Sequence, residues 1–388
     1  MLAVLAPGQG SQKPGFLTPW LTLPGVEARL RWWSVLAGVD LVHLGTEADA
    51  EEIKDTAKTQ PLLVAAALLT AEQLPLYDAA VFAGHSVGEL AASTLAGVFS
   101  PEAAVTLAAV RGREMAAACA LEPTGMSAVL GGDPDEVIAA VEAAGLHPAN
   151  RNGAGQVVAA GTLSGLEKLA ANPPARARII GLQVAGAFHT PYMAPAEEAL
   201  AAIAAGVTTA APTKLLLSNR DGSVVDHGPS MLQRLVKQVT APVRWDLCMA
   251  ALVDLGVTAV IELAPAGTLA GLVKRTIKGI EIVTVNTPDD LAAARDLITR
   301  HGSAPAHEPH PHQQHSVVVA TTAGTFTPAE GLVEGTEVSD GQRIGAVQTG
   351  QGPIDVTTHG AGVLAEWLVT PDEPVAPGQP LARIGDQL

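Results

Sequence analysis

A single serine lies between two glycines in the run G-H-S-V-G, residues 84–88, directly after an apolar stretch. The pattern G-x-S-x-G is typical of a sharp turn from a strand into a helix, in which the glycines avoid steric clash and the serine hydroxyl projects from the sheet. Residues 79–83 are expected to form the strand and residues 87–96 the helix, with Gly97 as its C-cap. The pattern also arises by chance in a chain rich in glycine and alanine, but these flanking elements favour Ser86 as a nucleophile.

A nucleophilic serine needs a base, and histidine is the usual one. His189 stands in A-G-A-F-H-T-P-Y, residues 185–192, where an expected strand ends before a turn bounded by proline. That position would face a cleft between two subdomains. On the residues alone the choice stays open among the histidines before residue 301, which are His43, His85, His147, His189 and His227.

A second glycine-rich turn, P-G-Q-G-S-Q at residues 7–12, follows the expected first strand. It does not fit a dinucleotide-binding loop, because G-x-G-x-x-G requires glycine where Lys13 stands. A backbone N–H of this turn would suit an oxyanion hole, together with the N–H of Val87, the residue after the serine. A turn without catalytic function explains the same residues equally well.

Arg111 is a further residue that could take part in a reaction, by binding an acidic group. Ser100 and Pro101 start a helix in which Leu107 and Met115 share a face with Arg111. A guanidinium on an apolar face could clamp an acidic substrate. A snorkelling side chain or an internal ion pair is the alternative.

Short apolar runs alternate with alanine-rich helical stretches up to about residue 300, which predicts an α/β fold with a parallel sheet that includes residues 2–6 and 79–83. Between residues 125 and 187 the order is strand, helix, strand, strand, helix, strand. This order predicts a ferredoxin-like subdomain inserted into the larger one. Its expected elements are residues 126–130, 133–145, 147–151, 156–161, 163–171 and 177–184.

Residues 301–315, H-G-S-A-P-A-H-E-P-H-P-H-Q-Q-H, predict a solvated linker, with a loose metal site as a weaker alternative. The remainder, residues 316–388, contains a repeat: V-S-D-G-Q-R-I-G-A-V at 338–347 and V-A-P-G-Q-P-L-A-R-I at 375–384. Two similar halves suggest a small all-β barrel that resembles a biotinyl/lipoyl carrier domain. Such domains modify a lysine at a hairpin tip, where this chain has T-G-Q-G-P with Gln351, so we expect no attached group.

Composition narrows the classes of function. The net charge of −16 argues against a nucleic-acid partner, which needs a basic face. The longest apolar stretch, residues 61–69, is about half of the roughly 20 residues of a membrane span, and the N-terminus lacks a basic signal region. Two cysteines, Cys119 and Cys248, fit a reducing compartment, so we expect a cytoplasmic protein with no membrane or nucleic-acid partner.

Taken together, residues 1 to about 300 resemble the malonyl-CoA:acyl-carrier-protein transacylases, whose fold is α/β-hydrolase-like with a ferredoxin-like insertion. The matching motifs are P-G-Q-G-S-Q from Pro7, T-Q-P from Thr59, G-H-S-V-G-E from Gly84, R-G-R-E-M from Arg111, N-G-A-G-Q-V-V from Asn152, G-A-F-H-T from Gly186, S-N from Ser218, A-P-V-R-W from Ala241 and E-L-A-P-A-G from Glu262.

The resemblance implies a role for each matching residue. Ser86 would be acylated, His189 would be the base, and the N–H groups of Gln9 and Val87 would form the oxyanion hole. Arg111 would bind the malonyl carboxylate, with Gln60 and Asn152 lining or supporting the site. Val87 and Phe188 would favour malonyl over methylmalonyl groups, and the backbone carbonyl of Arg244 would orient the base.

The implied reaction moves a malonyl group from malonyl-CoA to the phosphopantetheine thiol of an acyl carrier protein for fatty-acid or polyketide synthesis. No cofactor is implied, and a monomer is expected. A basic docking patch for the carrier protein is guessed at Arg234, Lys237, Lys274 and Arg275. The alternatives are a serine hydrolase or esterase, a trans-acting polyketide acyltransferase, and a scaffold in which the C-terminal unit is the active part.

Overall fold

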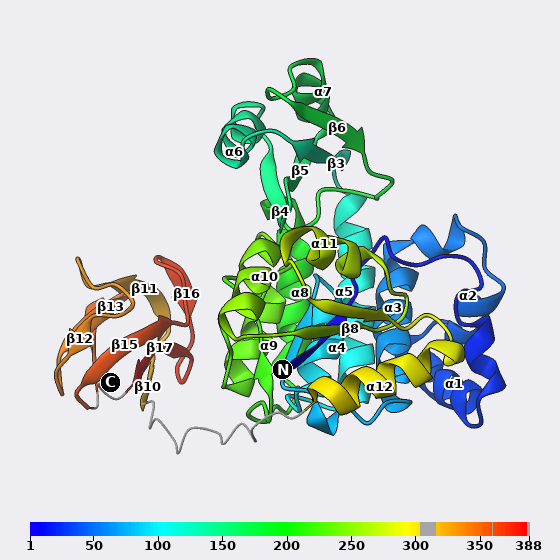
Figure 1. Cartoon of the computed structure of the whole chain (residues 1–388). Coiled ribbons are helices and arrows are strands. Elements are labelled where there is room, and N and C mark those ends of the chain that lie inside the picture. The colour runs from blue at the N-terminus through cyan, green and yellow to red at the C-terminus, as the bar shows by residue number, and fades with distance from the viewer. Residues whose placement is uncertain (303–315, 359, 386–388) are drawn as a thin grey trace. The chain divides into compact units, whose positions relative to one another are not determined.

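The computed structural model describes residues 1–302, 316–358 and 360–385. The chain divides into two compact units, Met1–His307 and Glu308–Leu388. Figure 1 shows the first as a mixed α/β body with a smaller sheet projecting from it, and the second as a pair of β-sheets. Of the predicted linker, His301 is the last residue of a helix and residues 303–315 lie outside the described residues.

The centre of the first unit is a parallel sheet of five strands in the order β7-β2-β1-β8-β9. Strand β1 has the predicted bounds and is buried along its whole length. Strand β2 begins two residues later than predicted, because Ala79 caps a short 3-10 turn. The strands are β1 (Leu2–Ala6), β2 (Val81–Gly84), β7 (Leu215–Leu216), β8 (Ala259–Glu262) and β9 (Glu281–Thr284).

Helices cover both faces of this sheet. Leu2, Val4 and Ala6 pack into one hydrophobic core, and Ala3 and Leu5 pack into a second, as the alternation of side chains along a strand requires. The helices are α1 (Val26–Ala37), α2 (Leu41–Thr46), α3 (Thr56–Glu72), α4 (Gly88–Leu95), α5 (Pro101–Cys119), α8 (Ala194–Ala204), α9 (Gly228–Lys237), α10 (Trp245–Asp254), α11 (Thr268–Thr276) and α12 (Leu291–His301). Within the described residues none of the helices is both long and apolar enough to cross a membrane.

Short 3-10 turns connect several of these elements. They are η1 (Thr18–Thr22), η2 (Glu52–Lys54), η3 (Leu76–Asp78), η4 (Pro191–Met193) and η5 (Pro288–Asp290).

The smaller sheet of the first unit is antiparallel, in the order β4-β5-β3-β6, and has its own core. Its elements follow the predicted order, but β6 ends at Gly181 and not at residue 184, and the chain beyond it lines a cavity through Leu182 and Val184. The elements are β3 (Thr124–Gly131), α6 (Pro134–Ala143), β4 (His147–Gly153), β5 (Gln156–Thr162), α7 (Leu163–Ala171) and β6 (Ala177–Gly181).

One segment of the larger subdomain pairs with the smaller sheet. Asn150 of β4 forms a parallel bridge with Val243, in the connection between α9 and α10. The N–H of Val243 donates to the carbonyl of Ala149 at 2.9 Å, and the N–H of Arg151 donates to the carbonyl of Val243 at 2.9 Å. Backbone hydrogen bonds therefore join the two subdomains at this point.

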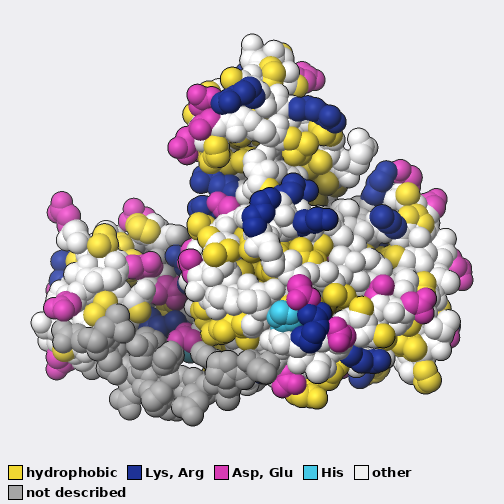
Figure 2. Space-filling model, viewed as in Figure 1, with side chains coloured by type: hydrophobic (Ala, Val, Ile, Leu, Met, Phe, Trp, Pro, Cys, Tyr) yellow, Lys and Arg dark blue, Asp and Glu magenta, His cyan; other side chains and the backbone are white. Residues whose placement is uncertain are grey.

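Basic side chains gather on one part of the surface of the first unit. Figure 2 shows them at the centre of the visible face, over α11. Lys274 and Arg275 in the last turn of α11 are exposed, as is Lys278 beyond it. This acidic chain therefore carries a local positive patch.

The second unit consists of two antiparallel four-stranded sheets, β10-β17-β15-β12 and β14-β13-β11-β16, around a core that includes Phe326 and Ile344. The strands are β10 (Ser316–Val319), β11 (Gly324–Pro328), β12 (Glu337–Val338), β13 (Arg343–Thr349), β14 (Gly352–Thr357), β15 (Gly362–Trp367), β16 (Glu373–Val375) and β17 (Pro380–Gly385).

The sequence repeat of this unit is also a structural repeat. In each copy a short strand, β12 or β16, turns into a longer one, β13 or β17. The side chain of Gln342 accepts from the N–H of Ser339 at 2.8 Å, and that of Gln379 accepts from the N–H of Ala376 at 3.0 Å. The repeated glutamine thus closes the same turn in both halves.

Candidate active site

Ser86 occupies a tight turn between β2 and α4. Its φ of 54° is left-handed, which a serine rarely adopts outside strained turns. A Cβ at Gly84 would lie 2.2 Å from the carbonyl carbon of Gly88, and a Cβ at Gly88 would lie 2.3 Å from the oxygen of Ala6. Glycine is therefore required on both sides of the serine, and α4 starts at Gly88, one residue later than predicted.

His189 contacts this serine directly, with 2.8 Å between its Nε2 and Ser86 Oγ. Its Nδ1 lies 2.7 Å from the backbone carbonyl of Gln238, so Nδ1 must carry the proton and Nε2 is left to accept from the hydroxyl. Burial, reinforced by the positive charge of Arg111, lowers the pKa of His189 to about 3. The imidazole is therefore neutral in the folded protein and able to take a proton from Ser86.

The expectation that the carbonyl of Arg244 orients the base is wrong. The carbonyl of Arg244 accepts from the N–H of Cys248 at 3.2 Å, in the first turn of α10, and its guanidinium pairs with Asp246. Gln238 is the C-cap of α9, where a carbonyl has no partner within the helix. That free carbonyl faces His189 instead.

Arg111 is only 2% exposed, on α5 beside the serine. Its Nη1 donates to Gln60 Oε1 at 2.7 Å, and its Nη2 donates to Gln238 Oε1 at 2.9 Å and lies 3.5 Å from Ser86 Oγ. Burial lowers the pKa of Arg111 to about 10, which leaves the group cationic at neutral pH. Amide oxygens are weaker partners than a carboxylate, so the guanidinium can gain by binding an anionic group beside the nucleophile.

The turn at residues 7–12 packs against the turn that carries the serine. A Cβ at Gly8 would lie 2.5 Å from the carbonyl oxygen of His85, so only glycine permits this approach. Gln9 lines the same cavity as Ser86 and Val87, and its side-chain amide donates to Thr56 Oγ1 at 3.3 Å. Val87 caps the N-terminus of α4, where N–H groups have no partner within the helix.

A cavity of about 250 Å³ opens between the two subdomains beside these groups. Asn152 and Phe188 both line it, and Asn152 Oδ1 lies 2.8 Å from Nε2 of His85 across the boundary between the subdomains. Of the predicted site residues, Arg244 alone does not contribute to this cavity. It is lined by Gln9, Gln60, Ser86, Val87, Arg111, Asn152, Phe188 and His189, with Met126, Val158, Leu182, Thr268, Leu269 and Leu272 among its further residues.

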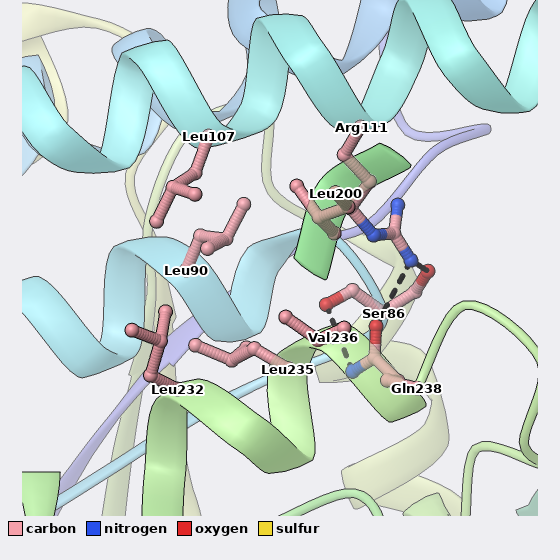
Figure 3. Close-up of a pocket in the computed structure, with 9 residues that line it drawn as sticks. All are labelled: Ser86, Leu90, Leu107, Arg111, Leu200, Leu232, Leu235, Val236 and Gln238. Carbon is pink, nitrogen blue, oxygen red and sulfur yellow. Dashed lines mark hydrogen bonds between the residues drawn. The ribbon is translucent and has the colours of Figure 1, made fainter. Parts of the chain in front are cut away.

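A second, smaller recess adjoins Arg111 and is lined mainly by side chains of α4, α5 and α9. Figure 3 shows aliphatic side chains from these helices, and from α8, beside Ser86, Arg111 and Gln238. They leave a cavity of about 10 Å³, room for about one water molecule. One side of the Arg111 guanidinium therefore faces apolar side chains, those of Leu90, Leu107, Leu200, Leu232, Leu235 and Val236.

Three polar residues of the site did not enter the prediction of roles: Glu89, Asn219 and Gln238. Asn219 Oδ1 accepts from the N–H of Ser86 at 2.8 Å, and its Nδ2 donates to the carbonyl of Gly84 at 2.7 Å. Glu89 and Asn219 belong to the motifs G-H-S-V-G-E and S-N, so the sequence could have marked both as site residues. Gln238 lies just before A-P-V-R-W, outside every matching motif, so nothing in the sequence marked it.

Comparisons with known proteins agree with this geometry. The acyl transferase domain family matches residues 5–300. The malonyl CoA-acyl carrier protein transacylase of Mycobacterium tuberculosis (strain H37Rv) is 55% identical over 302 residues, which cover 76% of this chain and 100% of that protein. The protein of the same name from Escherichia coli K12 is 33% identical over 305 residues, covering 76% and 99%.

Solved structures give the same result. The crystal structure of MCAT from Mycobacterium tuberculosis superposes with a TM-score of 0.74 at 55% identity, covering 76% of this chain and 99% of that one. A malonyl-transacylase solved in complex with a type II polyketide acyl carrier protein gives a TM-score of 0.70 at 30% identity, with the same coverage.

The parallel sheet, the nucleophile turn and the matched residues 5–300 define an acyltransferase, and the chain belongs to the acyl transferase domain family. Within that family it is one of the malonyl-CoA:acyl-carrier-protein transacylases, the name carried by relatives that it matches over their whole length.

Proposed function

We propose that this enzyme moves the malonyl group of malonyl-CoA to the phosphopantetheine thiol of an acyl carrier protein through a malonyl ester of Ser86. The observation that carries the proposal is the pairing of Ser86 and His189 at 2.8 Å beside a buried guanidinium whose two shortest hydrogen bonds go to amide oxygens. A free carboxylate on the acyl group would supply the anion that Arg111 lacks.

In the first half-reaction, His189 Nε2 takes the proton of Ser86 Oγ as the oxygen attacks the thioester carbon. The negative charge on the thioester oxygen is stabilised by the N–H groups of Gln9 and Val87. The carbon–sulfur bond then breaks, and the CoA thiolate takes the proton from His189. The malonyl ester remains on Ser86.

In the second half-reaction the carrier-protein thiol gives its proton to His189, and its sulfur attacks the ester carbon. Ser86 leaves as an alkoxide and takes the proton back, which restores the enzyme. The proposed chemistry uses side chains and backbone groups of the chain alone. Phe188 and Val87, which line the cavity, would crowd a methyl branch on the malonyl carbon.

Incubation of the purified protein with malonyl-CoA should add one malonyl mass, located on the peptide that contains Ser86. The variant Ser86→Ala should show no added mass, because the attacking oxygen is gone. Mass spectrometry of the intact protein and of its peptides measures both. A malonyl adduct that persists on Ser86→Ala would refute the proposed nucleophile.

An esterase with the same turn is the competing function. It would hydrolyse neutral esters at a rate comparable with malonyl transfer, and a buried Arg111 would contribute nothing to such substrates. Assays of a neutral chromogenic ester beside malonyl-CoA separate the two functions. Transfer to several purified carrier proteins then distinguishes fatty-acid from polyketide synthesis, of which we propose the former.

We further propose that the carrier protein docks over α11. Leu269 and Leu272 of this helix line the catalytic cavity, while Lys274 and Arg275 are exposed. The other two cations guessed from the sequence already have acidic partners, since Arg234 lies 2.9 Å from Asp221 and Lys237 lies 2.8 Å from Glu197. The patch over α11 is thus better suited to attract an acidic partner.

We also propose finer assignments for two parts of the fold. The strand order β4-β5-β3-β6 supports a ferredoxin-like subdomain, and the larger subdomain with its nucleophile turn supports an α/β-hydrolase-like fold. The repeated turns of the second unit support a biotinyl/lipoyl-like barrel. Gln351 stands in the turn of the β13–β14 hairpin, where a carrier domain would have its lysine, so no prosthetic group is expected there.

A further inference from the structure

Glu89 is a buried carboxylic acid that the proposed reaction does not use. It lies in the first turn of α4, three residues after Ser86, and is 1% exposed. Its Oε1 accepts from the backbone N–H of Asn219 at 2.6 Å, and its Oε2 accepts a short hydrogen bond from Nε2 of Gln238. Both partners extend to the reacting groups.

One chain of hydrogen bonds runs from Glu89 through Gln238 to Arg111. Nε2 of Gln238 faces three acceptors: Glu89 Oε2, the carbonyl of Ser86 at 3.2 Å and Asn219 Oδ1 at 3.2 Å. Its Oε1 accepts from Arg111 Nη2 at 2.9 Å, and Figure 3 shows the two ends of the amide hydrogen-bonded to Arg111 and to Ser86. A flipped amide would turn two N–H donors toward the guanidinium, so the acceptors around Nε2 fix which end faces Arg111.

A second chain of hydrogen bonds runs from Glu89 through Asn219 to the backbone of Ser86. Glu89 holds the backbone of Asn219, whose side chain accepts from the N–H of Ser86 at 2.8 Å. The carbonyl of Ser86 accepts from Gln238. Both polar groups of the serine peptide are thus held by residues that Glu89 contacts.

We propose that Glu89 is a positioning residue for malonyl transfer, which acts through the amide of Gln238 to aim the Arg111 guanidinium at the acyl carboxylate and so sets the preference for malonyl over uncharged acyl groups. This inference rests on the proposed function, in which Arg111 binds that carboxylate. Glu89 itself does not contact the substrate.

The charge-free isostere cannot replace Glu89. A glutamine at this position has one oxygen and one NH2 group, whereas the two neighbours, Asn219 N–H and Gln238 Nε2, are both donors. Either orientation sets an NH2 group against a donor. The strain is relieved when Gln238 rotates away, and Arg111 then loses an acceptor.

Burial raises the pKa of Glu89 to about 8 and lowers the pKa of Arg111 to about 10, so both groups are ionised between these values. The test compares wild type and Glu89→Gln at a pH in this range. The kcat/KM ratio for malonyl-CoA over acetyl-CoA is measured in each. We expect the ratio to fall about tenfold in Glu89→Gln, mainly through KM for malonyl-CoA. A ratio within twofold of wild type would overturn the proposal.

A double-mutant cycle separates positioning from a general loss of structure. In an Arg111→Ala background, Glu89→Gln should leave the malonyl-to-acetyl ratio unchanged, because the group through which it acts is absent. The control is Glu72→Gln, an exposed carboxyl at the end of α3 that pairs with Arg29 at 3.2 Å and should not change the ratio. An equal fall of the ratio with and without Arg111 would overturn the proposed route.

If Glu89→Gln does not fold, Glu89→Asp gives the same test with the carboxyl drawn back by one methylene. We expect the ratio to fall in the same direction, and an unchanged ratio would again overturn the proposal. Failure of the underlying function is recognised separately, because wild type would then acquire no malonyl group on Ser86.

Discussion

Arg111 places a buried positive charge beside the nucleophile turn. A guanidinium enclosed by leucines loses most of its hydration, and the amide oxygens of Gln60 and Gln238 replace it only in part. A carboxylate that displaces one of these amides would form a charge-assisted pair in apolar surroundings. Under the proposed function this difference would make the site selective, since a neutral acyl group would leave the charge without that partner.

Replacement of Arg111 by alanine should therefore reduce kcat/KM for malonyl-CoA by about 100-fold, which corresponds to about 3 kcal/mol for one lost partner of a buried pair. Transfer of acetyl groups should fall less, so the malonyl-to-acetyl ratio should drop. Steady-state kinetics with both thioesters measures this. An unchanged ratio would remove the clamp role, and Arg111→Lys, which cannot reach both amides, should give an intermediate ratio.

The depressed pKa of His189 predicts the acid side of the pH profile. Because the pKa in the free enzyme is about 3, kcat/KM for malonyl transfer should not fall by half near pH 6.5, the ordinary value for histidine. A pH series of the rate of Ser86 malonylation checks this. Half-loss near pH 6.5 would show that the imidazole is protonated as in water.

The lowered pKa of His189 also makes the stability of the fold depend on pH. Between about pH 3 and 6.5 the histidine is neutral in the folded chain and protonated in the unfolded chain. The unfolded state then binds more protons, so the contribution of His189 to stability is lost as the pH falls through this window.

The role of Arg244 could not be settled from the sequence for a physical reason. Which carbonyl faces His189 depends on where α9 ends and α10 begins, and the two helices are only a few residues apart. A shift of that boundary moves the free carbonyl from Gln238 to another residue. The residues alone left the choice of base and the purpose of the turn at Gln9 open, and only the resemblance to the transacylase motifs grouped Ser86 with Gln9, Arg111 and His189. The structure brings these four residues together at one cavity.

At the scale of elements, the strand-to-helix turn at Ser86 was predicted well, because its glycines are required by contacts within the turn and with β1. The end of β6 was not. Leu182 and Val184 continue the alternation of the strand before them, but they line the cavity between subdomains. A pattern of apolar residues does not distinguish burial in a sheet from burial in a cavity wall.

Helix α11 gives a prediction at this scale. The reversal Arg275→Glu should raise KM for the carrier protein several-fold at low salt, since like charges would then face each other, and the effect should shrink as salt screens it. Initial rates over a range of carrier concentrations and ionic strengths measure it. Arg31→Glu, a reversal on the surface of α1, is the control and should not change KM. Equal effects of both reversals would contradict docking over α11.

At the scale of the whole molecule, the family match ends at residue 300, close to the end of the first unit at His307. The matched relatives are covered almost completely, yet they cover only 76% of this chain. The second unit is therefore additional to what those enzymes contain. Its repeat was visible in the sequence because the turn glutamines Gln342 and Gln379 recur with their flanking residues, while its assignment to the carrier-domain class stays a prediction.

A shortened protein that ends at His307, the end of the first unit, should retain malonyl transfer within about twofold of the full chain. The hydrophobic cores of the first unit are formed by its own residues, so it should fold alone. Transfer assays on both lengths, with circular dichroism to verify folding, measure this. Loss of transfer by a folded short form would assign the second unit a part in the reaction.

The short connection between α9 and α10 has a mechanical consequence. At one end the carbonyl of Gln238 accepts from the imidazole of His189, and five residues later Val243 forms an isolated bridge with β4 of the smaller subdomain. A rotation of one subdomain against the other would pull on the segment that aligns the base. The width of the cleft and the alignment of the base are thus coupled through the same few residues.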